Sequence, residues 1–298
     1  MIPFNYHHLY YFYTAARHLS ISKAAGELRI SQPALSTQIK QLELFLNTQL
    51  FERENRKLAL TEEGHIAFSY AQSIFDLGRE FLDGMLDRSQ MGRTRIQIGV
   101  TNSTGKAFAN ALVQFVLNDS PSAHILLHED SLANMIQNLK DHKLDILLSD
   151  TPHQTSQEEA IQNQLAGRLP VVFCAHPKIA KKIKNFPADF EKSPLILPTT
   201  QSGVYQALQE YFTTEKLNPN ILSEVQDVEL IHRMALDGLG IAPLDKYSVS
   251  HSPFKEKLNV LPFGPKQGIH LNIYLISKNR KHPNPLVSHI LRKFKIQA

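Results

Sequence analysis

The sequence contains one cysteine, Cys174, in 298 residues. A single cysteine excludes a disulfide within the chain and any zinc or iron–sulfur site built from several cysteines. Cys174 lies in the apolar run LPVVFCAH, which favours a buried strand position over a reactive thiol. Long apolar runs are also missing, since no stretch approaches the roughly 20 residues that span a bilayer. We therefore expect no membrane segment.

Signals for secretion and for catalysis are missing too. The amino terminus, MIPFNYHHLYYFY, lacks the charged start and cleavage site of a secretory signal, which favours a cytoplasmic protein. Neither HExxH nor GxSxG occurs, and the 14 histidines are scattered along the chain. The segment GVTNSTGKA (99–107) has five residues between its glycines and alanine after its lysine, unlike a phosphate-binding loop. We predict neither a metal nor a cofactor.

The charge is only mildly basic, with a net charge of +4 and a pI near 9.0. Such a balance permits nucleic-acid binding without requiring it. Residues 1–60 hold seven Lys/Arg against four Asp/Glu, whereas residues 61–92 are net acidic. Because there is no polybasic arm, affinity for DNA would depend on where a few cations are placed.

The segment SQPALSTQIKQL (31–42) predicts a capped amphipathic helix. Ser31 can cap its amino end, and Pro33 falls in the first turn, where a missing N–H costs nothing. Leu35, Ile39 and Leu42 repeat at i, i+4 and i+7 and form a stripe that must face a core. Hydroxyls, amides and one cation remain outside, as is typical of a helix that reads base edges in a major groove. This outer face carries Pro33, Thr37 and Lys40, flanked by Gln32, Ser36 and Gln41.

The flanking segments complete a winged helix-turn-helix pattern. A short helix, SKAAGEL (22–28), precedes the amphipathic one and carries small residues for close packing. Leu50 and Phe51 then predict a short strand, and residues 58–60 a returning strand. The turn between them is cationic, and its Arg53 is suited to backbone phosphates. A solvated charged loop is the alternative for this turn.

A long helix and a change of pattern follow. Thr61 with two glutamates begins a helix that runs to about Arg88, and a helix of this length usually packs on a second copy of itself. SQMGR (89–93) predicts a hinge, which gives a DNA-binding domain over 1–60, a linker over 61–92 and a third domain over 93–298.

Strands and helices alternate in the third domain. Residues 95–149 read as strand, helix, strand, helix, strand, which predicts a parallel sheet with right-handed crossovers. A second set of strands and helices covers 169–243, and a strand at 271–277 and a basic helix from about Pro285 end the chain. The two sets predict two similar subdomains in an α/β fold.

Several spaced segments resemble the LysR-type transcriptional regulators. The opening NYHHLYYF is similar to the branch whose members activate sodium/proton antiporter genes, and GLGIAPL (238–244) is similar to the family's effector domain. The segments that carry the main resemblance are LSISKAAGEL (19–28), SQPALSTQIKQLE (31–43), LFER (50–53) and LTEEG (60–64).

The resemblance implies a mainly α winged helix-turn-helix domain, a dimerising linker helix and a two-lobed, periplasmic-binding-protein-like α/β domain. The first lobe would cover about 93–165 and 266–298, and the second about 166–265. The implied partners are double-stranded promoter DNA, a small-molecule or ion effector and further copies of the chain, as a homodimer or homotetramer, with RNA polymerase as another candidate. The family pattern assigns Gln32, Pro33, Ser36 and Thr37 to bases and Arg53 to the DNA backbone; the helical wheel alone adds Lys40.

Effectors of this family lie between the lobes, at loops that follow strands. Ligands of open α/β sheets bind at the carboxyl ends of strands, and hydroxyls ahead of a helix suit an anion. Capping of the helices by the same hydroxyls is the alternative, and the branch resemblance adds a cation held by Asp150 or Glu129. The candidate effector residues are Thr101, Asn102, Ser103, Ser149, Asp150, Thr200, Gln201 and Ser202.

Two functions remain in competition. A DNA-binding transcriptional regulator, expected to activate in response to an effector, explains the whole chain. A small-molecule-binding module or an enzyme built on residues 93–298 is the alternative, and it leaves the first 60 residues without a role.

Overall fold

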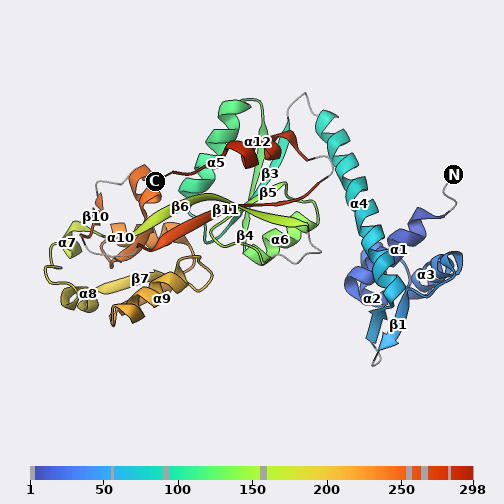
Figure 1. Cartoon of the computed structure of the whole chain (residues 1–298), viewed down its shortest axis with the longest axis horizontal. Coiled ribbons are helices and arrows are strands. Elements are labelled where there is room, and N and C mark those ends of the chain that lie inside the picture. The colour runs from blue at the N-terminus through green and yellow to red at the C-terminus, as the bar shows by residue number, and fades with distance from the viewer. Residues whose placement is uncertain are drawn as a thin grey trace. The chain divides into compact units, whose positions relative to one another are not determined.

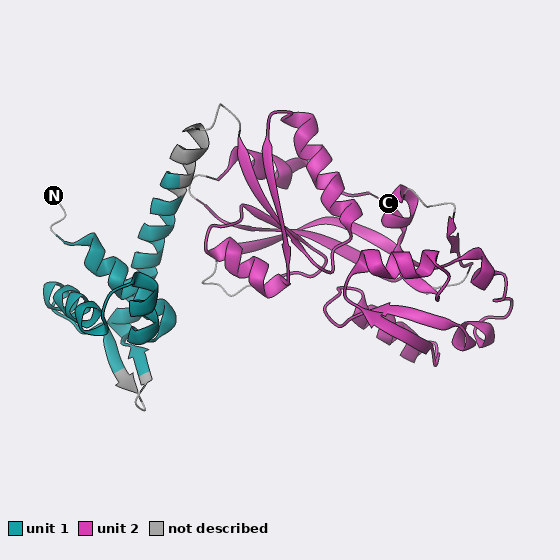
Figure 2. Cartoon of the chain, turned by 180° about the vertical axis from the view of Figure 1, so that it is seen from behind, with its two compact units in different colours: residues 1–86 teal, residues 87–298 magenta. Residues whose placement is uncertain are grey.

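The computed structural model describes residues 4–54, 57–89, 94–154, 160–252, 257–262, 268–280 and 283–297. It divides into two compact units, residues 1–86 and 87–298, which Figure 2 shows in two colours. We describe each unit by itself. Residues 90–93 of the predicted hinge lie outside the described residues.

Three helices open the first unit: α1 (Tyr6–His18), α2 (Ile21–Leu28) and α3 (Gln32–Leu46) (Figure 1). Each follows a residue whose side chain accepts a backbone N–H of the first turn, which satisfies one of its orphan donors. α3 extends four residues beyond the predicted end at Leu42, because Asn47 supplies a left-handed cap there. The capping residues at the amino ends are Asn5, Ser20 and Ser31.

The core of this unit forms where the three helices meet. Leu35, Ile39 and Leu42 of α3 are buried, as their spacing predicts. Ala24 and Ala25 of α2 are buried as well, and their small side chains let the neighbouring helices approach closely. The predicted wing is present as the hairpin of β1 (Phe51–Glu54) and β2 (Lys57–Leu60), in which Phe51 faces Leu60.

Helix α4 (Glu62–Ser89) starts against the hairpin. Thr61 accepts the Gly64 N–H at 2.9 Å, and a Cβ on Gly64 would meet the Leu50 carbonyl oxygen at 2.1 Å, so this approach requires glycine. At 28 residues α4 is long, yet no helix in the described part of the chain is both long and apolar enough to cross a membrane.

The apolar residues of α4 face two ways. One set, which includes Ala71 and Phe75, packs into the core of the first unit. The other set is exposed and recurs every three or four residues along one side of the helix. The exposed set contains Ile66, Tyr70, Ile74, Leu77 and Phe81.

The second unit begins with the predicted alternation of strands and helices. Strand β3 pairs in parallel with both β4 and β5, so these three strands confirm the predicted parallel pattern. Ile96, Ile98 and Val100 of β3 are buried, and this strand lies between β5 and β4 in the sheet. The elements are β3 (Arg95–Thr101), α5 (Lys106–Asp119), β4 (His124–Asp130), α6 (Leu132–Lys140) and β5 (Ile146–Ser149).

Two long strands make the sheet mixed rather than parallel. β6 (Ile161–Ala175) and β11 (His270–Lys278) are antiparallel to each other, and β11 is antiparallel to β5. The predicted strand at 169–175 is therefore too short. Polar residues such as Asn163 and Arg168 interrupt the apolar pattern of β6 and hide its first half from a reading of the sequence.

We call the region of β3–β5, α5, α6 and α12 (Pro285–Lys293) the first lobe, and the region of β7–β9 and α9–α11 the second lobe. In the second lobe β7 and β8 are parallel, and β9 pairs with the far half of β6. Strands β6 and β11 are shared by the two lobes, so the structure draws no sharp boundary between the lobes along the chain. The predicted lobe limits stay a prediction. The remaining elements are α7 (Pro177–Ala180), α8 (Ala188–Lys192), β7 (Pro194–Pro198), α9 (Tyr205–Thr214), β8 (Asn220–Val225), α10 (Val228–Leu236), β9 (Ala242–Asp245), α11 (Lys246–His251) and β10 (Asn259–Val260).

Candidate functional site

The polar face of α3 points away from the core of the first unit. Gln32, Thr37 and Lys40 are exposed, and so is Pro33, whereas Ser36 on the flank is half-buried. The burial of Leu35, Ile39 and Leu42 on the opposite side fixes this orientation. The face therefore offers an amide, two hydroxyls and one cation to a partner outside the chain.

The Thr37 hydroxyl on this face is already hydrogen-bonded within its own helix. It donates to the Pro33 carbonyl oxygen of its own helix at 2.9 Å. Its proton is therefore engaged within α3, and the side chain presents oxygen lone pairs and a methyl group outward. In a major groove these groups can accept a hydrogen bond or pack on a thymine methyl.

The wing is tied to α3 by a carboxylate that the sequence reading did not single out. Glu43 Oε1 accepts the Leu50 N–H at 2.8 Å and the Phe51 N–H at 3.3 Å. These bonds hold the start of β1 against the carboxyl half of α3. The backbone of Arg53 pairs with Leu58 in the hairpin, while its side chain lies outside what the structure describes.

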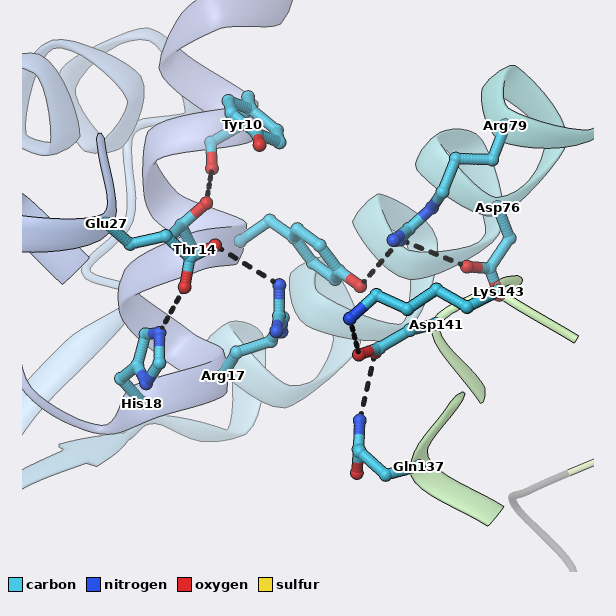
Figure 3. A network of polar contacts seen from close by, with 11 residues as sticks. Tyr10, Thr14, Arg17, His18, Glu27, Asp76, Arg79, Gln137, Asp141 and Lys143 are labelled. Carbon is cyan, nitrogen blue, oxygen red and sulfur yellow. Dashed lines mark hydrogen bonds and ion pairs between the residues drawn. The ribbon is translucent and has the colours of Figure 1, made fainter. Parts of the chain in front are cut away.

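A polar network joins the other helices of this unit, as Figure 3 shows. Glu27 of α2 accepts from His18 at 2.6 Å and pairs with Arg17 at 3.5 Å, which links α1 to α2. Arg79 of α4 donates to the Tyr13 hydroxyl at 3.2 Å. These contacts position the scaffold from which α3 projects.

Five of the eight predicted effector residues meet in one cluster between the lobes. Asp150, at the end of β5, accepts from Ser103 at 2.5 Å and from Ser202 at 3.2 Å. It also accepts the Gly203 N–H at 2.9 Å. The other two members, Thr101 and Ser149, are buried beside it, with their hydroxyl oxygens 3.5 Å apart.

The other three predicted residues lie at the margin of this cluster. The Asn102 backbone N–H donates to the Asp130 carbonyl oxygen, and Thr200 is exposed. Gln201 is exposed and accepts from Gln226 at 2.8 Å. The cluster also contains residues that the prediction missed, Thr104, Thr151 and Gly203, and its margin contains Gln226.

The hydroxyls do not serve as helix caps in the way the alternative reading expects. The N-cap residues of α5 and α9 are Gly105 and Val204, and neither has a side-chain cap. Ser103 and Ser202 bond to Asp150, and the Ser202 hydroxyl also accepts the Val204 N–H at 3.5 Å just ahead of α9. Asp150 is only 2% exposed, and this burial raises the pKa of its carboxyl above the ordinary value, although its three neutral donors act in the opposite direction.

A second seam joins the lobes at the amino end of α5. The Lys106 N–H donates to Glu229 of α10 at 3.1 Å, and the Phe108 ring stacks on Tyr247 of α11 with centroids 5.4 Å apart. His232 of α10 is buried, with its Nε2 unpaired among the described residues. Burial lowers the pKa of His232, and the nearby Glu229 acts in the opposite direction.

The structure bears on the cation alternative through the partners of the two carboxylates. Glu129 forms an ion pair with Lys106, and Asp150 is held by neutral donors. Within the described ranges no three His, Cys, Asp or Glu side chains are grouped so that they could hold a metal ion.

Comparisons with protein-family models match nearly the whole chain. Residues 6–65 match the model described as bacterial regulatory helix-turn-helix protein, lysR family. Residues 89–296 match the LysR substrate binding domain.

Individual relatives agree with these matches. The transcriptional activator protein NhaR of Escherichia coli (strain K12) is 29% identical over 232 residues, which cover 78% of this chain and 76% of that protein. The HTH-type transcriptional activator CmpR of Synechocystis is 27% identical over 255 residues, 86% of this chain and 83% of that protein.

Solved structures share the fold. CbnR, a LysR family transcriptional regulator, has a TM-score of 0.56 at 18% identity and covers 97% of this chain and 99% of its own. Vibrio fischeri DarR in complex with DNA has a TM-score of 0.54 at 19% identity, with 97% and 99% covered.

Proposed function

The chain belongs to the LysR family of bacterial transcriptional regulators, and we propose that it binds promoter DNA through α3 and activates transcription in response to an effector held between its lobes. The observation that carries the DNA-binding role is the outward polar face of α3. Activation is inferred from the activators NhaR and CmpR, to which the chain is similar.

We assign base contacts to α3 and phosphate contacts to the wing. Lys40 and the Gln32 amide suit base edges, and Thr37 suits an amino donor or a thymine methyl. Arg53 is assigned to a phosphate because its strand borders the wing turn. The remaining base contacts are assigned to Pro33 and Ser36.

The exposed apolar side of α4 supports assembly of copies of the chain. Its five residues from Ile66 to Phe81 recur at helical spacing, and a matching helix of a second copy would cover them. A homodimer places two α3 helices on a dyad-symmetric site, and a homotetramer places four. In this proposal the protein works in the cytoplasm, where it contacts DNA and RNA polymerase.

The effector site is assigned to the loops at the carboxyl ends of β3, β5 and β7. The hydrogen bonds around Asp150 support this, because they bring loops of both lobes together. We infer a regulatory rather than a catalytic role for this domain. The assigned residues are Thr101, Asn102, Ser103, Ser149, Asp150, Thr200, Gln201 and Ser202.

A gel-shift titration tests the proposal. The full chain is mixed at physiological salt with the duplex upstream of its own gene, and separately with a scrambled duplex of the same length and composition. Specific proteins prefer their site by about a thousandfold or more. Equal affinity for the two duplexes would contradict the proposal.

A further inference from the structure

Asp150 belongs to one lobe and bonds to both, with one carboxylate oxygen accepting from each lobe. It follows β5 of the first lobe, and its Oδ1 accepts from Ser103 of the same lobe at 2.5 Å. Its Oδ2 accepts from the Ser202 hydroxyl at 3.2 Å and from the Gly203 N–H at 2.9 Å, both from the second lobe. The carboxylate therefore bridges the lobes directly.

The groups that the second lobe offers here form a turn suited to an anion. Residues 199–204 fold back through the Ser202 N–H, which donates to the Thr199 carbonyl oxygen, and lead into the ten-residue helix α9. A hydroxyl and a backbone N–H ahead of a helix favour negative charge. The anion on this turn is the carboxylate of Asp150 itself.

The backbones of the two lobes also meet at this point. A Cβ on Gly203 would lie 2.2 Å from the Asp150 carbonyl oxygen and 3.1 Å from its carbonyl carbon. Backbone atoms cannot move aside as a flexible side chain can, so only glycine allows this approach. Asp150 and Gly203 therefore contact each other twice, through the carboxylate and through the backbone.

Asp130 shows what an ordinary carboxylate does at an equivalent place. It ends β4 of the same sheet and accepts from the Ser131 N–H at 2.6 Å and from the Asn134 amide at 3.0 Å. Both partners lie in its own lobe, at the start of α6. Asp130 therefore stabilises the turn next to it, whereas Asp150 bonds to groups of the other lobe.

We propose that Asp150 is an internal ligand of the second lobe, whose carboxylate occupies the turn 199–204 and holds the lobes closed without an external anion. It follows that a small carboxylate can enter this turn only in place of Asp150, and that an effector carrying such a group competes with it. This inference deepens the proposed effector role and rests on it.

Distance measurements between the lobes of the full-length protein test the inference. Spin labels are attached at Asn110→Cys in α5 and Glu210→Cys in α9, both exposed positions, while buried Cys174 stays unlabelled. Labelled chains are diluted with unlabelled chains, so that distances within one chain dominate. The comparison is made with Asp150→Ala, with Asp130→Ala as the matched control, and with formate or chloride at equal ionic strength.

We expect Asp150→Ala to shift the distance distribution to larger values and Asp130→Ala to leave it unchanged. Formate fits the space of the missing carboxylate, so it should restore the original distribution in Asp150→Ala, and chloride should not. The inference is overturned if Asp150→Ala leaves the distance unchanged, if Asp130→Ala opens the lobes equally, or if formate acts no better than chloride.

Two further variants keep the test decisive if Asp150→Ala does not fold. Gly203→Ala should open the lobes because the added methyl group displaces the turn 199–204. Formate should have no effect on this variant, since its Asp150 carboxylate is intact. Asp150→Asn keeps the volume and one acceptor oxygen and should give an intermediate shift. Unchanged distances in both would overturn the inference. Because no DNA is present, failure here is distinct from the loss of specific binding that would contradict the proposed function.

Discussion

The polar face of α3 and the polar cluster between the lobes are built in opposite ways. On α3 the side chains of Gln32, Thr37 and Lys40 extend to solvent, so their remaining hydrogen-bonding capacity is available to a partner. Between the lobes, the hydroxyls and Asp150 bond to one another, and all of them are buried or half-buried. The face of α3 can bond to a partner outside the chain, whereas the groups around Asp150 bond to one another.

The difference teaches where a substitution should be felt. A side chain that extends to solvent contributes little to the stability of the free protein, so its removal is felt mainly in the complex. A buried, mutually bonded side chain acts on the free protein as well, because its loss leaves the partner unsatisfied. We therefore expect substitutions on the buried side of α3 to lower stability and substitutions on its exposed side to lower DNA affinity.

The largest effect is expected from the buried side of α3. Leu35 is fully buried, and Leu35→Ala should lower the free energy of unfolding of the first unit by about 2–5 kcal/mol. Gln41→Ala, at an exposed position of the same helix, should change it by less than about 0.5 kcal/mol. Urea titration followed by hydrogen exchange of the α3 amides measures both. Similar losses in the two variants would break the division between core face and outer face.

The outer face should show the reverse behaviour. Thr37→Ala should weaken specific DNA binding by about 1–3 kcal/mol and relax the sequence preference, with no loss of stability. Thr37→Ser is the matched control, since it keeps the hydroxyl and removes the methyl group. Binding to duplexes with thymine or uracil at each position shows which group is read. A stability loss as large as that of Leu35→Ala would contradict the outward orientation.

The polar face of α3 and the Asp150 cluster also differ in how far the sequence alone predicts them. The face of α3 follows from a period of 3.6 residues within one segment, so Leu35 and Thr37 could be assigned to opposite sides without any tertiary information. The Asp150 cluster joins residues about 50 positions apart, as Ser103 and Ser202 are from it. The family resemblance indicated which loops lie at the effector site, but only the fold shows that the Asp150 carboxylate bridges these loops.

Other parts could not be predicted for identifiable reasons. The role of Glu43 depends on the backbone N–H groups of Leu50 and Phe51, which no side-chain pattern reveals. The first half of β6 carries polar residues because part of it is exposed, so its apolar signal begins late. Gly203 is a signal of the lobe contact that the sequence analysis did not use, since glycine permits a close backbone approach.

A smaller effect is expected at the wing, where contacts are electrostatic. Arg53→Ala should weaken binding to specific and scrambled DNA alike and reduce the slope of log affinity against log salt by about one unit. Arg53→Lys keeps the charge and should keep the slope. Affinities over a series of salt concentrations give the measurement. A selective loss of specific binding would move Arg53 from the phosphates to the bases.

The smallest effect concerns a buried group of the second unit. Burial lowers the pKa of His232 in the folded protein, so the unfolded chain takes up its proton first as the pH falls. The stability that His232 contributes is therefore complete above its ordinary pKa of about 6.5 and is lost as the pH falls through the lower value of the folded state. His232→Gln should flatten this part of the profile of unfolding free energy against pH. Parallel profiles for wild type and His232→Gln would show that proton uptake elsewhere controls the stability of the second unit in acid.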